Sequence, residues 1–306
     1  MNKLKKLGKG LEDISYLFLS QDENQVLDPT KSDAQKETAA YPVKVPTKSV
    51  GLIGNSTDFR DAFLVINLSL ALARLGMRIT VVDMDEDLPC LKFFLGRDVQ
   101  NTEISNPQML IKDGPLGVKI IGLNQKSLSF LASEEKEQEL MLKLKDIEEN
   151  SDLILISVMQ QNLLKISPVF KDLIREFLVL VNPESNNMIN AYKVMKIIFA
   201  HNPLAKVGAI IADIDHMYEI DKIYNKLAGA VRKFLDKELY KYGFMFKIKQ
   251  EIDSNTNIAS FYDADLTACI SNIAQIIVLR LNLEETNPAA GKMFFKRIVD
   301  EFSGLR

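Results

Sequence analysis

Apolar and polar positions along the chain predict strands and helices that follow one another. Short runs of Val, Ile and Leu predict strands at 50–53, 79–82, 118–121, 152–157, 177–181 and 207–211, with one or two more around 243–252. Longer stretches with helical spacing predict helices at 60–75, 133–149, 161–175, 185–200, 215–240 and 264–282. The strands are apolar throughout, as in strands that are buried on both faces. The pattern predicts an α/β fold: a doubly wound, mostly parallel sheet with helices on both faces.

We place the α/β domain at 47–286 and expect further segments on both sides of it. Residues 1–20 predict an amphipathic helix, residues 21–46 contain three prolines among polar residues and predict a linker, and residues 287–306 predict a second amphipathic helix. The apolar positions of the two terminal helices are Leu11, Ile14, Leu17 and Phe18, and Phe294, Phe295, Ile298 and Phe302. Each helix either packs on the domain or contacts a partner, and the basic C-terminal one also suits a membrane surface.

Composition excludes several classes of function. The 306 residues include 38 Lys and Arg against 41 Asp and Glu, so the net charge of −3 does not favour a nucleic-acid partner. Two cysteines and two histidines are too few for a disulfide framework or a Cys- or His-rich metal centre. No uninterrupted apolar run reaches the ~18–20 residues that cross a bilayer. We therefore expect a cytoplasmic protein that does not cross a membrane.

The loop after the first strand begins at Gly54 and leads into a helix, and its surroundings carry a recognisable order of motifs. The segments are Asn67-Leu68-Ser69-Leu70-Ala71-Leu72-Ala73-Arg74-Leu75-Gly76, then Val81-Val82-Asp83-Met84-Asp85, and later Leu95-Gly96. This order resembles the MinD/ParA family of deviant P-loop ATPases. Further segments resemble the flagellar-number regulators of that family, FlhG or FleN: Val181-Asn182-Pro183-Glu184, residues 207–235, and Gly291-Lys292-Met293-Phe294-Phe295.

The resemblance implies a phosphate-binding loop, yet the residues that such a loop needs are altered. A working loop places a lysine on the β- and γ-phosphates and a Ser or Thr hydroxyl on Mg²⁺. The family's lysine position falls on Asp61, its hydroxyl position on Ala62, and the preceding glycine on Arg60. A register slipped by one residue would put Arg60 in place of the lysine and Asp61 in place of the hydroxyl. The early signature lysine becomes Ser56, and Ser157 replaces the acidic residue that ends the Walker B strand.

The resulting set is a degenerate nucleotide site made of Gly54, Asn55, Ser56, Thr57, Arg60, Asp61, Ala62, Asp83, Asp85 and Ser157. Asp83 and Asp85 survive where the family orients the attacking water and metal. They are either a remnant nucleotide or metal site, or carboxylates that cap the next helix or face solvent. We expect no cofactor, no catalytic residue and no metal. The alternative is ATP or ADP with Mg²⁺, bound through Arg60 and the two aspartates.

The interpretation that follows is a pseudo-ATPase that regulates the position or number of a bacterial surface structure, such as flagella, pili or a polar complex, through protein contacts. Its partners would bind the N-terminal helix and the nucleotide face, with a homodimer or a heterodimer with an active relative as further expectations. The alternatives are an ATP-binding or slowly hydrolysing enzyme with unusual loop residues, and a peripheral membrane scaffold. We expect it in the bacterial cytoplasm, with the inner membrane or a cell pole as places where it would gather.

Overall fold

The computed structural model describes residues 48–54, 60–95, 111–123, 134–163, 173–174, 176–248, 263–283 and 294–296. Several predictions lie outside these residues. They are the N-terminal helix 1–20 with Leu11, Ile14, Leu17 and Phe18, the linker 21–46, the loop residues Asn55, Ser56 and Thr57, and Ile298 and Phe302 of the C-terminal helix.

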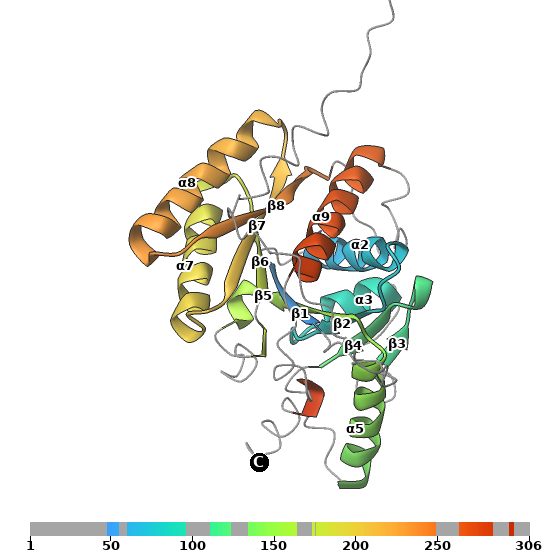
Figure 1. The fold of residues 1–306 in the computed structure, drawn as a ribbon. Coiled ribbons are helices and arrows are strands. Elements are labelled where there is room, and N and C mark those ends of the chain that lie inside the picture. Colours follow the sequence, from blue (N-terminus) through green and yellow to red (C-terminus); the bar gives the residue numbers. More distant parts are fainter. Residues whose placement is uncertain are drawn as a thin grey trace, which may run out of the picture. The chain divides into compact units, whose positions relative to one another are not determined.

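One eight-stranded sheet organises the described part of the chain (Figure 1). Its strands are β1 (Lys48–Gly54), β2 (Ile79–Asp83), β3 (Ile111–Asp113), β4 (Lys119–Gly122), β5 (Leu153–Met159), β6 (Glu176–Val181), β7 (Lys206–Ile214) and β8 (Leu239–Phe246). Their order across the sheet is β3-β4-β2-β5-β1-β6-β7-β8. All neighbouring pairs are parallel except β3 with β4. The expected doubly wound, mostly parallel α/β fold is therefore confirmed.

Helices cover both faces of this sheet, as Figure 1 shows. They are α2 (Arg60–Arg74), α3 (Pro89–Leu95), α5 (Glu134–Glu149), α7 (Ser185–His201), α8 (Tyr218–Leu235) and α9 (Ala264–Leu283). Two short 3₁₀ turns, Pro115–Gly117 and Gln160–Asn162, lie between them. One apolar core lies under α2, α3 and α9, and a second lies under α5, α7 and α8. Strands buried on both faces explain why the sequence shows continuous rather than alternating apolar runs.

Three predicted elements need correction, and two short elements were not predicted. The helix expected at 215–240 ends at Leu235, because Asp236 has a left-handed backbone (φ 53°) and the chain then enters β8. β8 therefore begins at Leu239, earlier than the strand expected around 243–252. The helix expected at 161–175 begins instead as a 3₁₀ turn at Gln160–Asn162, and residues 164–172 are not described. The short elements α3 and β3 were not predicted, since seven and three residues are too few to show a period.

Helix α9 is the one described helix that bears on the expectation about membrane-spanning segments. Its stretch Ala264–Leu281 is long and apolar enough to cross a bilayer by length and composition alone, with a mean hydropathy of 1.4. One side of α9 is nevertheless packed in the core beside α2 and β8, through residues such as Ile270, Ile273 and Ile277. The core helix of a folded domain passes the same composition test, and core packing accounts for the apolar residues on this side of α9, whereas Leu279 is exposed.

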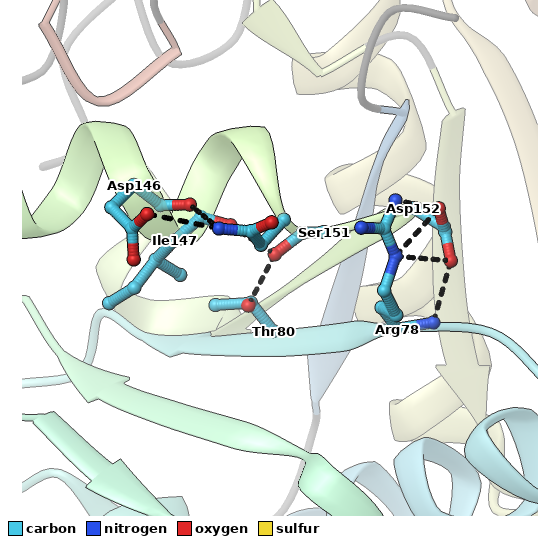
Figure 2. A network of polar contacts seen from close by, with 7 residues as sticks. Arg78, Thr80, Asp146, Ile147, Ser151 and Asp152 are labelled. Carbon is cyan, nitrogen blue, oxygen red and sulfur yellow. Dashed lines mark hydrogen bonds and ion pairs between the residues drawn. The ribbon is translucent and has the colours of Figure 1, made fainter.

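Polar contacts fix the turn from α5 into β5 against the start of β2 (Figure 2). Asp152 accepts hydrogen bonds from the backbone N–H of Arg78 at 2.8 Å and from its Nη2 at 2.6 Å. The guanidinium lowers the pKa of Asp152, chiefly through this hydrogen bond. Nearby, the buried hydroxyls of Thr80 and Ser151 lie 2.7 Å apart. These contacts set the register of β2 and β5, and the register decides which residues come together where the strands end.

Candidate functional site

The candidate site lies at the carboxyl ends of the parallel strands, the edge where open α/β sheets bind ligands. The order of strands reverses direction around β1, so Gly54, the last residue of β1, lies at the switch point. Five neighbouring strands end at this edge, and four of them place a polar residue there. β2 ends at Asp83, β5 carries Ser157, Asn182 follows β6, and β7 carries Asp213, while β1 ends at Gly54. The site is built from strand ends that are far apart in the sequence.

Asp61 lies directly over the end of β1. A Cβ atom added to Gly54 would overlap the Asp61 carboxylate, with the Cγ of Asp61 only 2.8 Å away. The side chain of Asp61 therefore folds back against the first residue of the loop, in the space that the missing Cβ leaves open. Ala62, at the position expected for a magnesium-binding hydroxyl, is buried in the apolar core under α2. The start of α2 thus offers a carboxylate and a methyl group where a phosphate site needs an ammonium and a hydroxyl.

Arg60 is engaged by an aspartate from the far side of the site. Its Nη1 lies 3.1 Å from Oδ2 of Asp213, and the Nδ2 of Asn182 donates to the same oxygen at 3.1 Å. Asp213 has a left-handed backbone (φ 56°), a conformation that Asp tolerates better than most residues. The three side chains join the start of α2 to the ends of β6 and β7. The guanidinium of Arg60 therefore forms an ion pair with the carboxylate of Asp213.

Asp83 is fully buried and caps helix α3. Its Oδ2 accepts hydrogen bonds from the backbone N–H groups of Cys90 at 2.7 Å and Leu91 at 3.0 Å, in the first turn of α3. Burial, followed by the charge of Asp85, raises the pKa of Asp83 to about 8, although the backbone donors act in the opposite direction. Burial thus favours the protonated form of this carboxyl. Its contacts with the backbone N–H groups of Cys90 and Leu91 are those of a helix cap.

Asp85 is almost as buried, yet it borders a hollow. Its carboxylate accepts hydrogen bonds from the backbone N–H of Met159 at 2.9 Å and from the Nδ2 of Asn162 at 2.8 Å. Burial raises its pKa, and the charges of Asp87 and Glu86 add to this, while the two donors oppose it. A hollow of about 350 Å³ opens here, lined by Asp85, Glu86, Asp87, Met159, Gln161 and Asn162.

Ser157 and Cys90 complete this half of the site. Ser157 stands on β5 beside Asp83 of β2, and its Oγ lies 3.4 Å from the Sγ of Cys90. Burial, followed by the charge of Asp83, raises the pKa of the Cys90 thiol well above its ordinary value. A protonated, fully buried thiol is a poor nucleophile and a poor metal ligand. Among the described residues, no group of three or more His, Cys, Asp or Glu side chains is arranged to hold a metal ion.

The two C-terminal aromatic residues in the described part are packed inside the domain. Phe295 is fully buried and Phe294 nearly so, in the same core as α5, and their rings meet edge to face. The carboxylate of Glu148, on α5, accepts hydrogen bonds from the backbone N–H groups of Phe294 at 2.8 Å and Phe295 at 3.2 Å. Of the two alternatives for the C-terminal segment, packing on the domain or contact with a membrane or partner, the burial of these two rings favours packing on the domain.

Several residues that shape the site were not among those predicted. Asn162, Asn182 and Asp213 each bind a predicted residue or its partner, and Glu148 fixes the C-terminal segment. Asn182 and Asp213 had one signal in the sequence, since each follows the apolar part of a parallel strand. Asn162 and Glu148 had none, because their partners lie 77 and 146 positions away along the chain.

These contacts do not fit a bound nucleoside triphosphate with Mg²⁺. A carboxylate about 4 Å from a triphosphate oxygen would be repelled by roughly 4 kcal/mol at an effective dielectric constant of about 20. Asp61 stands at the lysine position that the resemblance implies, and its carboxylate lies against Gly54. The one cation at the start of α2, Arg60, has Asp213 as its partner. Oδ2 of Asp83 accepts hydrogen bonds from two backbone N–H groups of α3, whereas Asp85 borders the hollow.

Comparison with known proteins places the fold in one class. No protein-family model matches the sequence, and no curated protein matches it significantly. Solved structures do match, and the fold is that of the MinD and ParA P-loop NTPases.

Three of these structures illustrate the match. The first is from the MinC:MinD cell division protein complex of Aquifex aeolicus (17% identity, 78% of this chain, 97% of the matched chain, TM-score 0.52). The second is the septum site-determining protein MinD of Pyrococcus horikoshii, complexed with Mg-ADP (16% identity, 78% of this chain, 98% of the matched chain, TM-score 0.51). The third is pNOB8 ParA bound to nonspecific DNA (14% identity, 78% of this chain, 100% of the matched chain, TM-score 0.54). Identities this low show the fold alone.

Proposed function

We propose that this protein is a MinD/ParA-like pseudo-ATPase that acts through contacts with other proteins. The observation that carries the proposal is the position of Asp61, whose carboxylate lies against Gly54 at the start of the phosphate loop. A carboxylate there repels phosphate, and its placement keeps the end of β1 compact without a ligand. The ion pair of Arg60 with Asp213 supports the same conclusion, since binding phosphate through Arg60 would require breaking that pair.

The proposed role is control of the position or number of a bacterial surface structure, of which flagella, pili and a polar complex are examples. The resemblance of the sequence to FlhG and FleN supports this choice. The MinC:MinD complex and the DNA-bound ParA among the similar structures indicate that this fold works in assemblies. We propose protein partners rather than DNA because the net charge of the chain is −3.

The nucleotide part of the proposal is tested by calorimetric titration of the full chain with ATP and Mg²⁺. We expect no binding stronger than a Kd of about 1 mM. The informative variant is the double substitution Asp61→Lys with Ala62→Thr, which restores the two side chains that the loop lacks; Asp61→Ala with Ala62→Thr is its matched control. We expect gain of ATP binding by the lysine variant only. Micromolar binding by the unmodified chain that Arg60→Ala weakens would favour the ATP-binding alternative.

The partner and location parts need separate tests. Affinity capture from the native cell with the full chain and with a chain lacking residues 1–46 tests whether the N-terminal helix recruits the partner.

Co-sedimentation with anionic vesicles, comparing the full chain with one that ends at residue 288, tests the membrane-scaffold alternative. We expect equal, low pelleting, because Phe294 and Phe295 are packed in the core. We propose a cytoplasmic location, and gathering at the inner membrane or a pole would depend on the partner.

A further inference from the structure

The layer formed by α7 and α8 has two chemically different ends. Strands β6 and β7 are parallel, so both helices begin at the carboxyl edge of the sheet and end at the amino edge. Helix α8 has 18 residues and is about 27 Å long. The ends of this layer therefore lie on opposite edges of the domain, and each end presents exposed apolar side chains.

We call the end at the carboxyl edge the acidic end. Its apolar side chains are Ile189, Met217 and Tyr218, which are 53%, 62% and 73% exposed. The ring of His216 stacks on Tyr218 at a centroid distance of 5.4 Å. The stretches 182–189 and 213–222, which form this end, contain five carboxylates and one lysine. Two of the carboxylates already have cationic partners within the chain, Asp213 with Arg60 and Asp221 with Lys241.

We call the opposite end the basic end. Leu204 is 91% exposed, the highest value among the large apolar residues that are described, and Phe234 is 67% exposed. Lys237 links the two stretches that form this end, because its Nζ donates a hydrogen bond to the carbonyl of Pro203 at 3.0 Å. The Nζ of Lys233 lies over the ring of Phe234. The stretches 199–206 and 232–238 contain four Lys and Arg residues against two carboxylates.

The exposed apolar side chains of the two ends do not belong to the core, and the acidic end shares Asn182 and Asp213 with the candidate site. The buried side of α8 is made by Ile220, Ile223, Leu227 and Val231, which pack on the sheet and leave Tyr218 and Phe234 outside. Aromatic residues and Met are enriched where proteins contact one another, and a polar rim of opposite charge adds specificity. An apolar surface with acidic residues around it complements an apolar surface with basic residues around it, and this chain carries both.

We propose that the acidic end of one copy binds the basic end of a second copy of this chain. Such a contact is head-to-tail, so each copy keeps one free end and assembly continues into open chains rather than stopping at a dimer. The patches are smaller than a standard interface of about 1,600 Å², so the contact is weak, concentration-dependent and reduced by salt. It does not depend on whether the phosphate loop binds nucleotide.

The test is sedimentation velocity of the full chain at low and high salt over roughly 5–200 µM. We expect the average mass to rise with concentration at low salt and to fall towards the monomer when salt is added. A variant of the basic end, Leu204→Gln with Phe234→Gln, should weaken association roughly tenfold or more, and so should a variant of the acidic end, Met217→Gln with Tyr218→Gln. The matched control is Leu142→Gln with Leu279→Gln, on α5 and α9, whose side chains are 70% and 61% exposed.

Mixing the two variants distinguishes this contact from a symmetric one. Each variant alone has only one intact end, but the two together contain one matching pair of ends. We therefore expect each variant to stay monomeric alone and the equimolar mixture to form 1:1 dimers that grow no further. Circular dichroism checks that all variants fold. A monomeric unmodified chain at 200 µM and low salt, a control that weakens as much as the end variants, or a mixture that stays monomeric would each overturn the proposal.

Discussion

The two halves of the carboxyl edge hold their carboxylates in opposite ways. Where β2 and β5 end, Asp83 and Asp85 are almost completely buried and accept hydrogen bonds from backbone N–H groups and from an amide. Where β6 and β7 end, Asp213 is partly exposed and pairs with Arg60, a cation from the start of α2. In the first half the carboxyl groups accept these hydrogen bonds from N–H donors, whereas the second half uses an ion pair near solvent.

This difference indicates which half of the edge responds to pH and which responds to salt. A buried carboxyl that receives backbone donors resists change but has a shifted pKa, so it responds to pH. A half-exposed ion pair contributes little to stability and is screened by salt, so it can be broken at small cost. Substitutions on the β2–β5 side should therefore have large effects on folding, and those on the β6–β7 side small ones.

The largest expected effect is on the pH dependence of stability. The pKa of Asp83 rises from an ordinary value of 3.8 to about 8 on folding, so its contribution to stability is fully present below pH 4 and is lost as pH rises through 8. The slope is at most about 1.4 kcal/mol per pH unit, or about 4 kcal/mol between pH 5 and pH 8. Urea unfolding of the unmodified chain and of Asp83→Asn across this range measures it. We expect the variant to lack most of the slope; equal slopes would contradict the assignment.

The second prediction concerns the cap of α3. Asp83→Ala removes the acceptor of two buried N–H groups, those of Cys90 and Leu91, and should lower the free energy of unfolding by about 3 kcal/mol at pH 7. Asp83→Asn keeps a carbonyl oxygen at the same place and should cost much less at this pH. If the alanine and asparagine variants are equally unstable in urea, the capping hydrogen bonds are not the reason for the loss.

A double-mutant cycle measures the contact of Asp61 with Gly54. Gly54→Ala forces the Asp61 carboxylate to move and should cost about 1–2 kcal/mol. In a background of Asp61→Ala the same substitution should cost less, since no carboxylate is displaced. Thermal and urea unfolding of the four chains give the coupling energy. A coupling energy near zero would mean that the two residues do not compete for this space.

The smallest effect is expected at the ion pair. Asp213→Asn and Arg60→Ala should each change the free energy of unfolding by less than about 1 kcal/mol, because the side chain of Arg60 is 43% exposed. The change should also shrink in high salt. A loss comparable to that of Asp83→Ala would show that the two halves of the edge are alike, and the comparison would fail.

Much of the fold could be predicted because it depends on local patterns. The continuous apolar strands and the spacing of apolar positions in α2, α5, α7 and α9 gave their places to within a few residues. Errors occurred where tertiary context overrides local pattern. Helix α8 stops at Leu235 because Asp236 turns left-handed, and the antiparallel β3 has only three residues, too few to predict.

The candidate site was predicted only in part. The loop and strand ends that contain Gly54, Asp61 and Asp83 follow from motif order, but the partners of these residues do not. Arg60 and Asp213 are 153 positions apart, and Glu148 reaches Phe294 across 146 positions. Phe294 and Phe295 illustrate the limit well, because an amphipathic pattern is the same whether its apolar side meets lipid, a partner or the core.

The sequence alone determined the class of fold, which depends on residue type and spacing along the chain. From the same patterns it predicts a phosphate loop that lacks its lysine and its hydroxyl. Only the tertiary structure decided that Asp61 lies over Gly54, that Asp83 caps α3 in a buried place, and that Arg60 is held by Asp213. The physical reason is that the environment of a side chain is set by groups distant in sequence. Burial, charge neighbours and available donors are therefore fixed only when the strands assemble into one sheet.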